Sequence, residues 1–140
     1  MSTTSKMITV EAHVQAPIQK VWSYYNQGEH IVHWNFADDS WHCPESEVDL
    51  RVGGKFSSTM SAKDGSFSFD FWGIYDEVNE HSHIAYTMGD DRKATVDFSA
   101  DGAATKVTVC FEMENQNPAE LQREGWQSIL NNFKKYTEGN

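Results

Sequence analysis

The chain begins with a regular alternation of apolar and polar positions. Over residues 7–14 every second position from Ile8 onward is apolar, which is typical of a β-strand with one buried face. Pro17 then predicts a helix that begins with proline at its first position, where a missing N–H costs nothing. We expect Gly28 to end this helix and a second short helix or turn to follow over residues 29–34. The apolar stripe of the first helix has helical spacing and consists of Ile18, Val21, Trp22 and Tyr25.

The middle of the chain predicts one loop and then a series of strands. Residues 35–47 are polar and irregular, so we expect a loop, and it carries Trp41 and Pro44. The Asp-Gly pairs at 64–65 and 101–102 are typical of hairpin turns. Alternating positions predict strands over residues 55–62, 67–78, 84–88, 96–98 and 107–113.

The last segment predicts a long amphipathic helix. Asn117 fits the N-cap, Pro118 the first position and Glu120 the third, and the helix is expected to run to about residue 137. Consecutive hairpins pair antiparallel, and a lone helix must lie on the sheet to bury its apolar stripe. We therefore predict an α+β fold, in which a curved antiparallel sheet of six to seven strands wraps round a long C-terminal helix, with two short helices after the first strand.

Composition narrows the choice of partner. The 11 Lys and Arg against 21 Asp and Glu give a formal net charge of −10, which argues against binding to nucleic-acid phosphates or to an anionic membrane surface. No apolar run approaches the length of a membrane span, and the start of the chain lacks the pattern of a secretory leader. We expect no membrane insertion and a cytoplasmic protein in which Cys43 and Cys110 are reduced structural thiols.

Histidines and cysteines raise the question of a metal site. His30, His33, His42 and Cys43 fall close together in sequence, and imidazole and thiolate are zinc ligands. However, adjacent residues such as His42 and Cys43 rarely chelate one ion well, and no Cys-x-x-Cys pair is present. We expect no metal and no cofactor.

Acid–base chemistry depends on which face of a strand is buried. Asp70 lies between Phe69 and Phe71, so alternation turns it toward solvent, whereas an inverted register would bring Asp70 and Trp72 into the interior. Both registers remain open. Asp97 and Arg92 raise the same question; ion pairs are expected there, although an inward Arg would suit a carboxylate or enolate ligand.

Several local strings, in their order and spacing, carry a family resemblance. They are Val14–Pro17 with Val21–Trp22, Trp34, Asp49–Phe56, Phe71–Val78, Thr105–Val109, and Glu124–Trp126 followed by Ile129–Leu130. Together they resemble the START-like superfamily (SRPBCC, helix-grip fold), in the branch named for activators of a heat-shock chaperone ATPase, also called polyketide-cyclase-like. The resemblance implies one START-like domain over residues 1–140, with a core at about 7–137, and a cavity between the sheet and the last helix. It implies no catalytic set, because members of this branch share none.

Aromatic residues are the main functional lead. They make up 13% of the chain and must either fill the core or line a hollow in it. We predict that the protein binds a small hydrophobic or amphipathic organic ligand. The predicted ligand-binding residues are Trp34, Trp41, His42, Phe56, Met60, Phe69, Phe71, Tyr86, Arg92, Phe98, Phe111, Trp126 and Phe133.

Two alternatives stay open. One is a cyclase- or hydrolase-type enzyme that uses Asp70 or His42 as a pocket acid or base. The other is a co-chaperone-like protein-interaction module, and a large exposed apolar patch would support it. A chaperone partner is the less favoured expectation, because the sequence shows no second domain. We expect a monomer or a homodimer.

Overall fold

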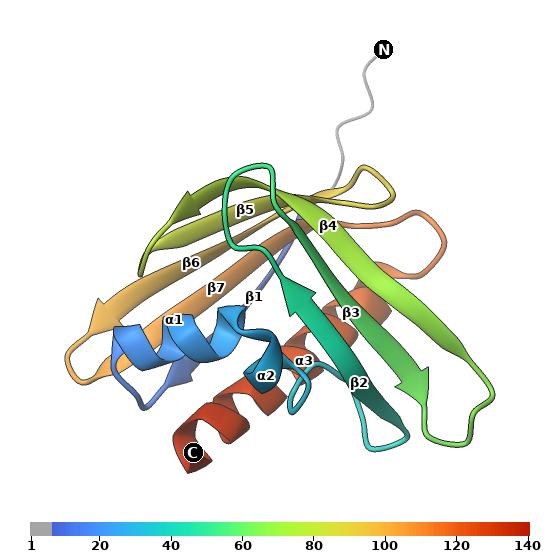
Figure 1. Ribbon diagram of the computed structural model, residues 1–140, viewed down its shortest axis with the longest axis horizontal. Coiled ribbons are helices and arrows are strands. Elements are labelled where there is room, and N and C mark those ends of the chain that lie inside the picture. Colours follow the sequence, from blue (N-terminus) through green and yellow to red (C-terminus); the bar gives the residue numbers. More distant parts are fainter. Residues whose placement is uncertain (1–6) are drawn as a thin grey trace.

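Seven antiparallel strands form one curved sheet, and a long C-terminal helix crosses its concave face (Figure 1). The computed structural model describes residues 7–140. The order across the sheet is β1-β7-β6-β5-β4-β3-β2, which confirms the predicted fold class. The strands are β1 (Met7–Val14), β2 (Trp41–Val48), β3 (Lys55–Ala62), β4 (Ser68–Asn79), β5 (His83–Met88), β6 (Lys93–Asp101) and β7 (Ala104–Glu112), and the helices are α1 (Ile18–Asn26), α2 (Gly28–Ile31) and α3 (Ala119–Gly139).

The apolar alternation decides which face of each strand is buried. In β1 and β7 buried and exposed or half-buried positions alternate without a break. These two strands pair in a register that places Ile8 opposite Phe111 and Val10 opposite Val109. All four side chains are buried, so the first and last strands of the chain form one continuous apolar surface under α3.

The filled part of the core lies where α1 and α3 meet the sheet. Phe98 on β6 makes an edge-to-face contact with Trp22 of α1, at 5.1 Å between ring centroids. Phe133 of α3 has no exposed surface, and its ring lies 5.0 Å from those of both Tyr25 and Trp34. Aromatic packing of this kind holds the two helices against the sheet.

One predicted loop is wrong in part. Residues 41–48 form the edge strand β2, paired antiparallel with β3. Pro44 cannot donate to a ladder, which argues against a central strand but is tolerated at an edge or a bulge. The register of β2 shifts between His42 and Glu45, so the strand accommodates Pro44 at an irregularity that the sequence pattern conceals.

The predicted helix starts are displaced by one residue. Pro17 and Pro118 occupy the N-cap positions of α1 and α3, rather than the first helical positions. Asn117 does not cap α3; its side chain instead contacts Glu114. Gly28 begins α2 instead of only ending α1.

The sequence predicts neither a membrane-spanning helix nor a secretory leader. Within residues 7–140, no helix combines the length and the apolar character needed to cross a membrane. The prediction about a secretory leader falls partly on residues 1–6, which lie outside the described residues.

Candidate functional site

A cavity of about 300 Å³ lies between the sheet and the helices. This volume is at the lower end of the range for small-molecule sites, roughly 300–1,000 Å³. Its lining residues come from β2, β3, β4, β5 and β7, from the turn after β5, from all three helices and from the segment that follows α2. The lining residues are Tyr25, Asn26, Ile31, Trp34, Asn35, Val48, Phe56, Ser58, Met60, Phe69, Phe71, Tyr75, Ile84, Tyr86, Arg92, Val109, Trp126, Ile129 and Leu130.

Aromatic rings form the sheet wall of the cavity. The ring of Phe56 lies 4.8 Å from that of Tyr86, 5.3 Å from that of Tyr75 and 5.7 Å from that of Phe71. Gly73 is the register partner of Phe56 on β4, and a Cβ at this glycine would come within 2.8 Å of the Phe56 ring. The missing side chain at Gly73 therefore leaves the space that the Phe56 ring occupies.

Three tyrosine side chains add polar atoms to this apolar wall. Tyr75 and Tyr86 are direct partners across the β4–β5 pair, and Tyr25 approaches from α1. Within residues 7–140 none of the three hydroxyls has a hydrogen-bond partner, although the residues Tyr75 and Tyr86 are buried. Burial is the main cause that raises the pKa of each tyrosine, and the neighbouring tyrosines add to it for Tyr25 and Tyr86. The hydroxyls therefore stay protonated at neutral pH and are available as donors.

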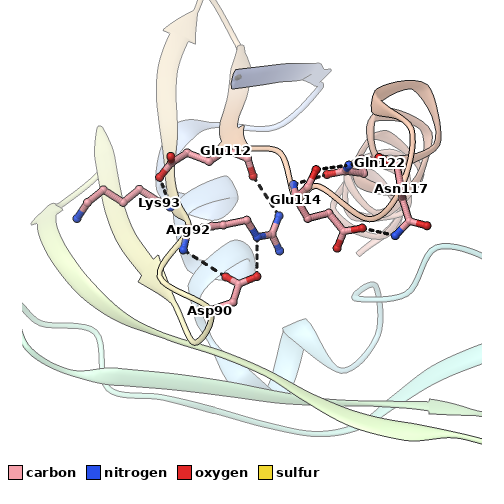
Figure 2. A network of polar contacts seen from close by, with 7 residues as sticks. All are labelled: Asp90, Arg92, Lys93, Glu112, Glu114, Asn117 and Gln122. Atoms are coloured by element: carbon pink, nitrogen blue, oxygen red, sulfur yellow. Dashed lines mark hydrogen bonds and ion pairs between the residues drawn. The ribbon is translucent and has the colours of Figure 1, made fainter. Parts of the chain in front are cut away.

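Arg92 is the one residue with a fixed charge among the described residues that line the cavity. Its Nε donates to Asp90 Oδ2 at 2.7 Å, and its Nη1 donates to the backbone oxygen of Glu112 at 3.0 Å. Figure 2 shows the guanidinium held between the turn after β5 and the end of β7. Its charge also lowers the pKa of Tyr86 to a small degree, against the larger effect of burial, so Arg92 lies near that hydroxyl.

Asn26 and Ser58 are two further polar residues of the lining. Asn26 is buried and donates from Nδ2 to the backbone oxygen of Trp22 at 3.0 Å, while its side-chain oxygen has no partner among the described residues. The hydroxyl of Ser58 lies 2.9 Å from that of Ser46. Asn26, on α1, and Ser58, on β3, both line the cavity. Hydrogen-bonding groups therefore occur on the α1 side as well as on the sheet side.

The structure divides the predicted ligand-binding residues into two groups. Those that line the cavity are Trp34, Phe56, Met60, Phe69, Phe71, Tyr86, Arg92 and Trp126. The others are not among its lining residues: Phe98, Phe111 and Phe133 are buried in the core, Trp41 packs against Phe67 and Phe69 at the β3–β4 hairpin, and His42 is exposed on β2.

In β4 the side chains of Asp70 and Trp72 face away from the cavity, so of the two registers left open the one that turns Asp70 toward solvent is correct. Asp70 is exposed and accepts a hydrogen bond from Thr59 at 2.8 Å. Trp72 is 38% exposed and lies under the ammonium group of Lys55, at 4.8 Å from the ring centroid. Neither side chain lines the cavity, and neither does His42. The two residues considered for pocket acid–base chemistry, Asp70 and His42, are therefore both outside it.

The remaining polar candidates have local partners. His30 Nδ1 lies 2.8 Å from the Tyr136 hydroxyl, and His33 stacks on the Tyr136 ring. Asp97 lies 2.6 Å from Nδ1 of His83 on the outer face of the sheet. Across residues 7–140, no group of three or more His, Cys, Asp or Glu is arranged to hold a metal ion.

Sequence reasoning found part of the polar lining and missed the rest. Tyr86 and Arg92 were predicted and line the cavity, whereas Tyr25, Tyr75 and Asn26 line it and were not among the predicted ligand-binding residues. A signal was present: inward tyrosines on one helix and on two neighbouring strands each bring a hydroxyl inside, where it needs a partner. Tyr25, Tyr75 and Tyr86, on a helix and two neighbouring strands that face it, therefore indicate a group of polar atoms within the apolar interior.

Comparison with known proteins identifies relatives of this chain. A family model described as "Activator of Hsp90 ATPase homolog 1-like protein" matches residues 15–138. A solution structure of an AHSA1-like protein from Aeromonas hydrophila is 40% identical, covers 96% of this chain and 93% of its own, and has a TM-score of 0.90. A protein from Cytophaga hutchinsonii is 51% identical over 95% of this chain and 92% of its own, with a TM-score of 0.82.

More distant structures share the fold. A protein from Chromobacterium violaceum is 22% identical over 96% of this chain and 98% of its own, with a TM-score of 0.85. No curated protein matches the chain.

Proposed function

We propose that this chain, which belongs to the family of Activator of Hsp90 ATPase homolog 1-like proteins, binds a small and largely apolar organic molecule in the cavity under its sheet. The observation that carries the proposal is the cavity itself. It holds about 300 Å³ and is walled mainly by aromatic and aliphatic side chains. Apolar hollows with a few placed polar groups are how proteins generally bind small molecules.

The chemistry of the lining favours binding over catalysis. Among the described residues that line the cavity there is no Asp, Glu, His, Lys or Cys. General acid–base catalysis most often uses His, Asp, Glu or Lys within reach of the reacting atom. The tyrosines keep their protons because burial raises the pKa of each one, so they are better suited to hydrogen-bonding a ligand than to taking a proton from it.

The test is binding of a neutral apolar probe, naphthylmethanol, measured by calorimetry and by quenching of tryptophan fluorescence. Two variants on α3 form a matched pair. Ile129→Trp places a large ring at a lining position, whereas Leu121→Trp places the same ring at a side chain that is 55% exposed and outside the lining. We expect saturable binding to the wild type and to L121W, and loss of binding in I129W with the fold retained.

Native mass spectrometry of protein purified without denaturation gives an independent reading. A reproducible bound mass would identify the class of the natural ligand. The proposal fails if the purified protein carries no small molecule and the wild type binds naphthylmethanol no better than I129W does.

An exposed aromatic cluster supports a second candidate function. Trp41 contacts Phe67 and Phe69 edge to face, and the two Phe rings are tilted against each other. The Phe67 and Phe69 side chains are 58% and 44% exposed. Exposed apolar clusters are found at protein contacts, and the family name points to a chaperone of the Hsp90 class. Stimulation of such a purified chaperone's ATPase by the wild type, and not by Phe67→Ser, would support this role.

A cytoplasmic location is part of the proposal. Cys43 and Cys110 are both free thiols, and unpaired cysteines are usual in reducing compartments. Fractionation of cells that express the natural protein tests this directly.

A further inference from the structure

We propose that the ligand carries a carboxylate, or an anionic oxygen group of similar shape, which pairs with Arg92 in the wall of the cavity. This inference rests on the proposed function and specifies the class of ligand. It is carried by the position of one guanidinium in the lining together with unpartnered donors beside it.

The positive charge of Arg92 determines the sign of the charge that we expect on the ligand. Arg92 is a permanent cation, and the described residues that line the cavity include no carboxylate and no other cation. The chain as a whole has a net charge of −10, which disfavours anions at long range. An anion must therefore be recognised by direct contact within the cavity, and Arg92 is where the lining offers that contact.

Arg92 and two tyrosines of the lining have hydrogen-bond donors without a partner in the described part of the chain. A guanidinium has five N–H groups. Arg92 uses one on Asp90 and one on the backbone oxygen of Glu112, which leaves three without a partner among residues 7–140. The hydroxyls of Tyr75 and Tyr86 also lack a partner there, and both residues line the cavity. Donors that face a cavity in this way are available to a ligand acceptor.

The guanidinium of Arg92 is held in a fixed orientation by its two protein partners. Asp90 Oδ2 accepts from Nε at 2.7 Å, and the oxygen of Glu112 accepts from Nη1 at 3.0 Å, so two separate segments hold its plane (Figure 2). The Arg92 side chain is only 22% exposed, whereas that of Asp90 is 54% exposed. Water therefore screens Asp90 more than Arg92, and Asp90 orients the cation without fully neutralising it on the cavity side.

The geometry suits a planar, two-oxygen acceptor. Arginine binds carboxylates through parallel N–H···O bonds, which a compact ammonium group cannot reproduce. The aromatic wall formed by Phe56, Phe71 and Trp126 would hold the apolar body of the same molecule. The ligand class that fits both halves is an aromatic or aliphatic carboxylic acid.

The experiment compares three probes that differ in one group: naphthoate, naphthylmethanol and naphthylmethylamine. Binding of each is measured by calorimetry at neutral pH to the wild type, Arg92→Gln, Arg92→Lys and Arg51→Gln. Arg51 is the matched control, because its Nε pairs with Asp49 two residues earlier at 2.9 Å, as that of Arg92 does with Asp90, but its side chain is 71% exposed and outside the lining.

We expect the wild type and R51Q to bind naphthoate at least about tenfold more tightly than naphthylmethanol, and the amine most weakly. R92Q should lose this preference while it still binds naphthylmethanol, which shows that the cavity is intact. R92K should keep part of it, because the charge remains but the paired donors do not.

The outcomes separate the two proposals. If naphthylmethanol binds but the acid binds no better, or if R92Q keeps the preference for the acid, the anion inference is overturned and the binding function stands. If none of the three probes binds the wild type and the purified protein carries no small molecule, the proposed function is overturned, and the anion inference falls with it.

Discussion

The indole of Trp126 stacks on the ring of Phe111, with 3.9 Å between the ring centroids and 10° between their planes. Phe111, on β7, has no exposed surface, whereas Trp126, on α3, also lines the cavity. One contact therefore joins the helix to the sheet and forms part of the cavity wall. We therefore expect a substitution of this residue to affect ligand binding and stability together.

Trp126→Ala tests that coupling. We expect the free energy of unfolding to fall by about 3 kcal/mol, because a large ring and its stacking partner are separated and a void remains. Urea denaturation measures the loss, and Leu121→Ala on the exposed face of the same helix should change stability by less than about 0.5 kcal/mol. A W126A protein that is as stable as the wild type and binds naphthylmethanol equally well would show that this ring is not part of the site.

Gly73 and Gly125 give opposite predictions for the same substitution. A Cβ at Gly73 would lie 2.8 Å from both the Phe56 ring and the backbone oxygen of Thr87, whereas a Cβ at Gly125 in α3 meets nothing within 4 Å. We expect Gly73→Ala to destabilise the protein by about 1–3 kcal/mol and to disturb probe binding through Phe56. Gly125→Ala should stabilise it by up to about 1 kcal/mol, because alanine favours the helix. Thermal denaturation of both variants provides the comparison, and equal effects of the two substitutions would contradict the close approach at Gly73.

The strands with a buried face could be predicted closely, because alternation reports burial directly. The ranges predicted for β1 and β3 match the structure. β2 escaped prediction because an edge strand needs no apolar alternation and Pro44 sits at its irregularity. Phe67, the first residue of the strand predicted over 67–78, lies before the start of β4 and is exposed.

The site was harder to predict than the fold. Aromatic residues at core spacing share one pattern whether they fill space or border it, so Phe111 and Phe133 could not be distinguished from Phe56 and Phe71 by periodicity. Their difference depends on contacts between elements, because Trp126 covers Phe111, and Tyr25 and Trp34 pack on Phe133. Arg92 was singled out for its charge, but the three unpartnered donors on its guanidinium follow only from the positions of Asp90 and Glu112.

Cys43 is predicted to be the slower of the two thiols in reaction with a disulfide reagent. It is 3% exposed, and burial raises the pKa of its thiol against weaker opposing hydrogen bonds to Ser58 and Glu45. Less thiolate forms at a given pH, and the reagent has poor access. In the native protein Cys110, which is half-buried, should react first, and both should react at the same rate in denaturant. Cys43→Ser and Cys110→Ser variants assign the two phases, and faster native labelling of Cys43 would contradict the expectation.

His83 makes stability depend on pH. Its Nδ1 lies 2.6 Å from Asp97 Oδ1 and its Nε2 lies 2.9 Å from Glu77 Oε1, so carboxylates on β6 and β4 flank the ring on both sides. Desolvation lowers the pKa of His83, but the hydrogen bonds and charges of Asp97 and Glu77 together outweigh it and raise the pKa above the ordinary 6.5. The folded protein therefore binds this proton more tightly than the unfolded chain does.

The stabilisation from His83 should be fully present below the unfolded-chain pKa of about 6.5 and should be lost as the pH rises through the higher folded value. We expect His83→Gln to lower the free energy of unfolding by about 1 kcal/mol near pH 6 and by clearly less above about pH 8. Urea denaturation at a series of pH values measures the difference, with His13→Gln, at an exposed position of β1, as the control. Only the protonated ring can donate to both carboxylates at once, so a H83Q deficit that stays constant over this range would show that they pair with a neutral histidine instead.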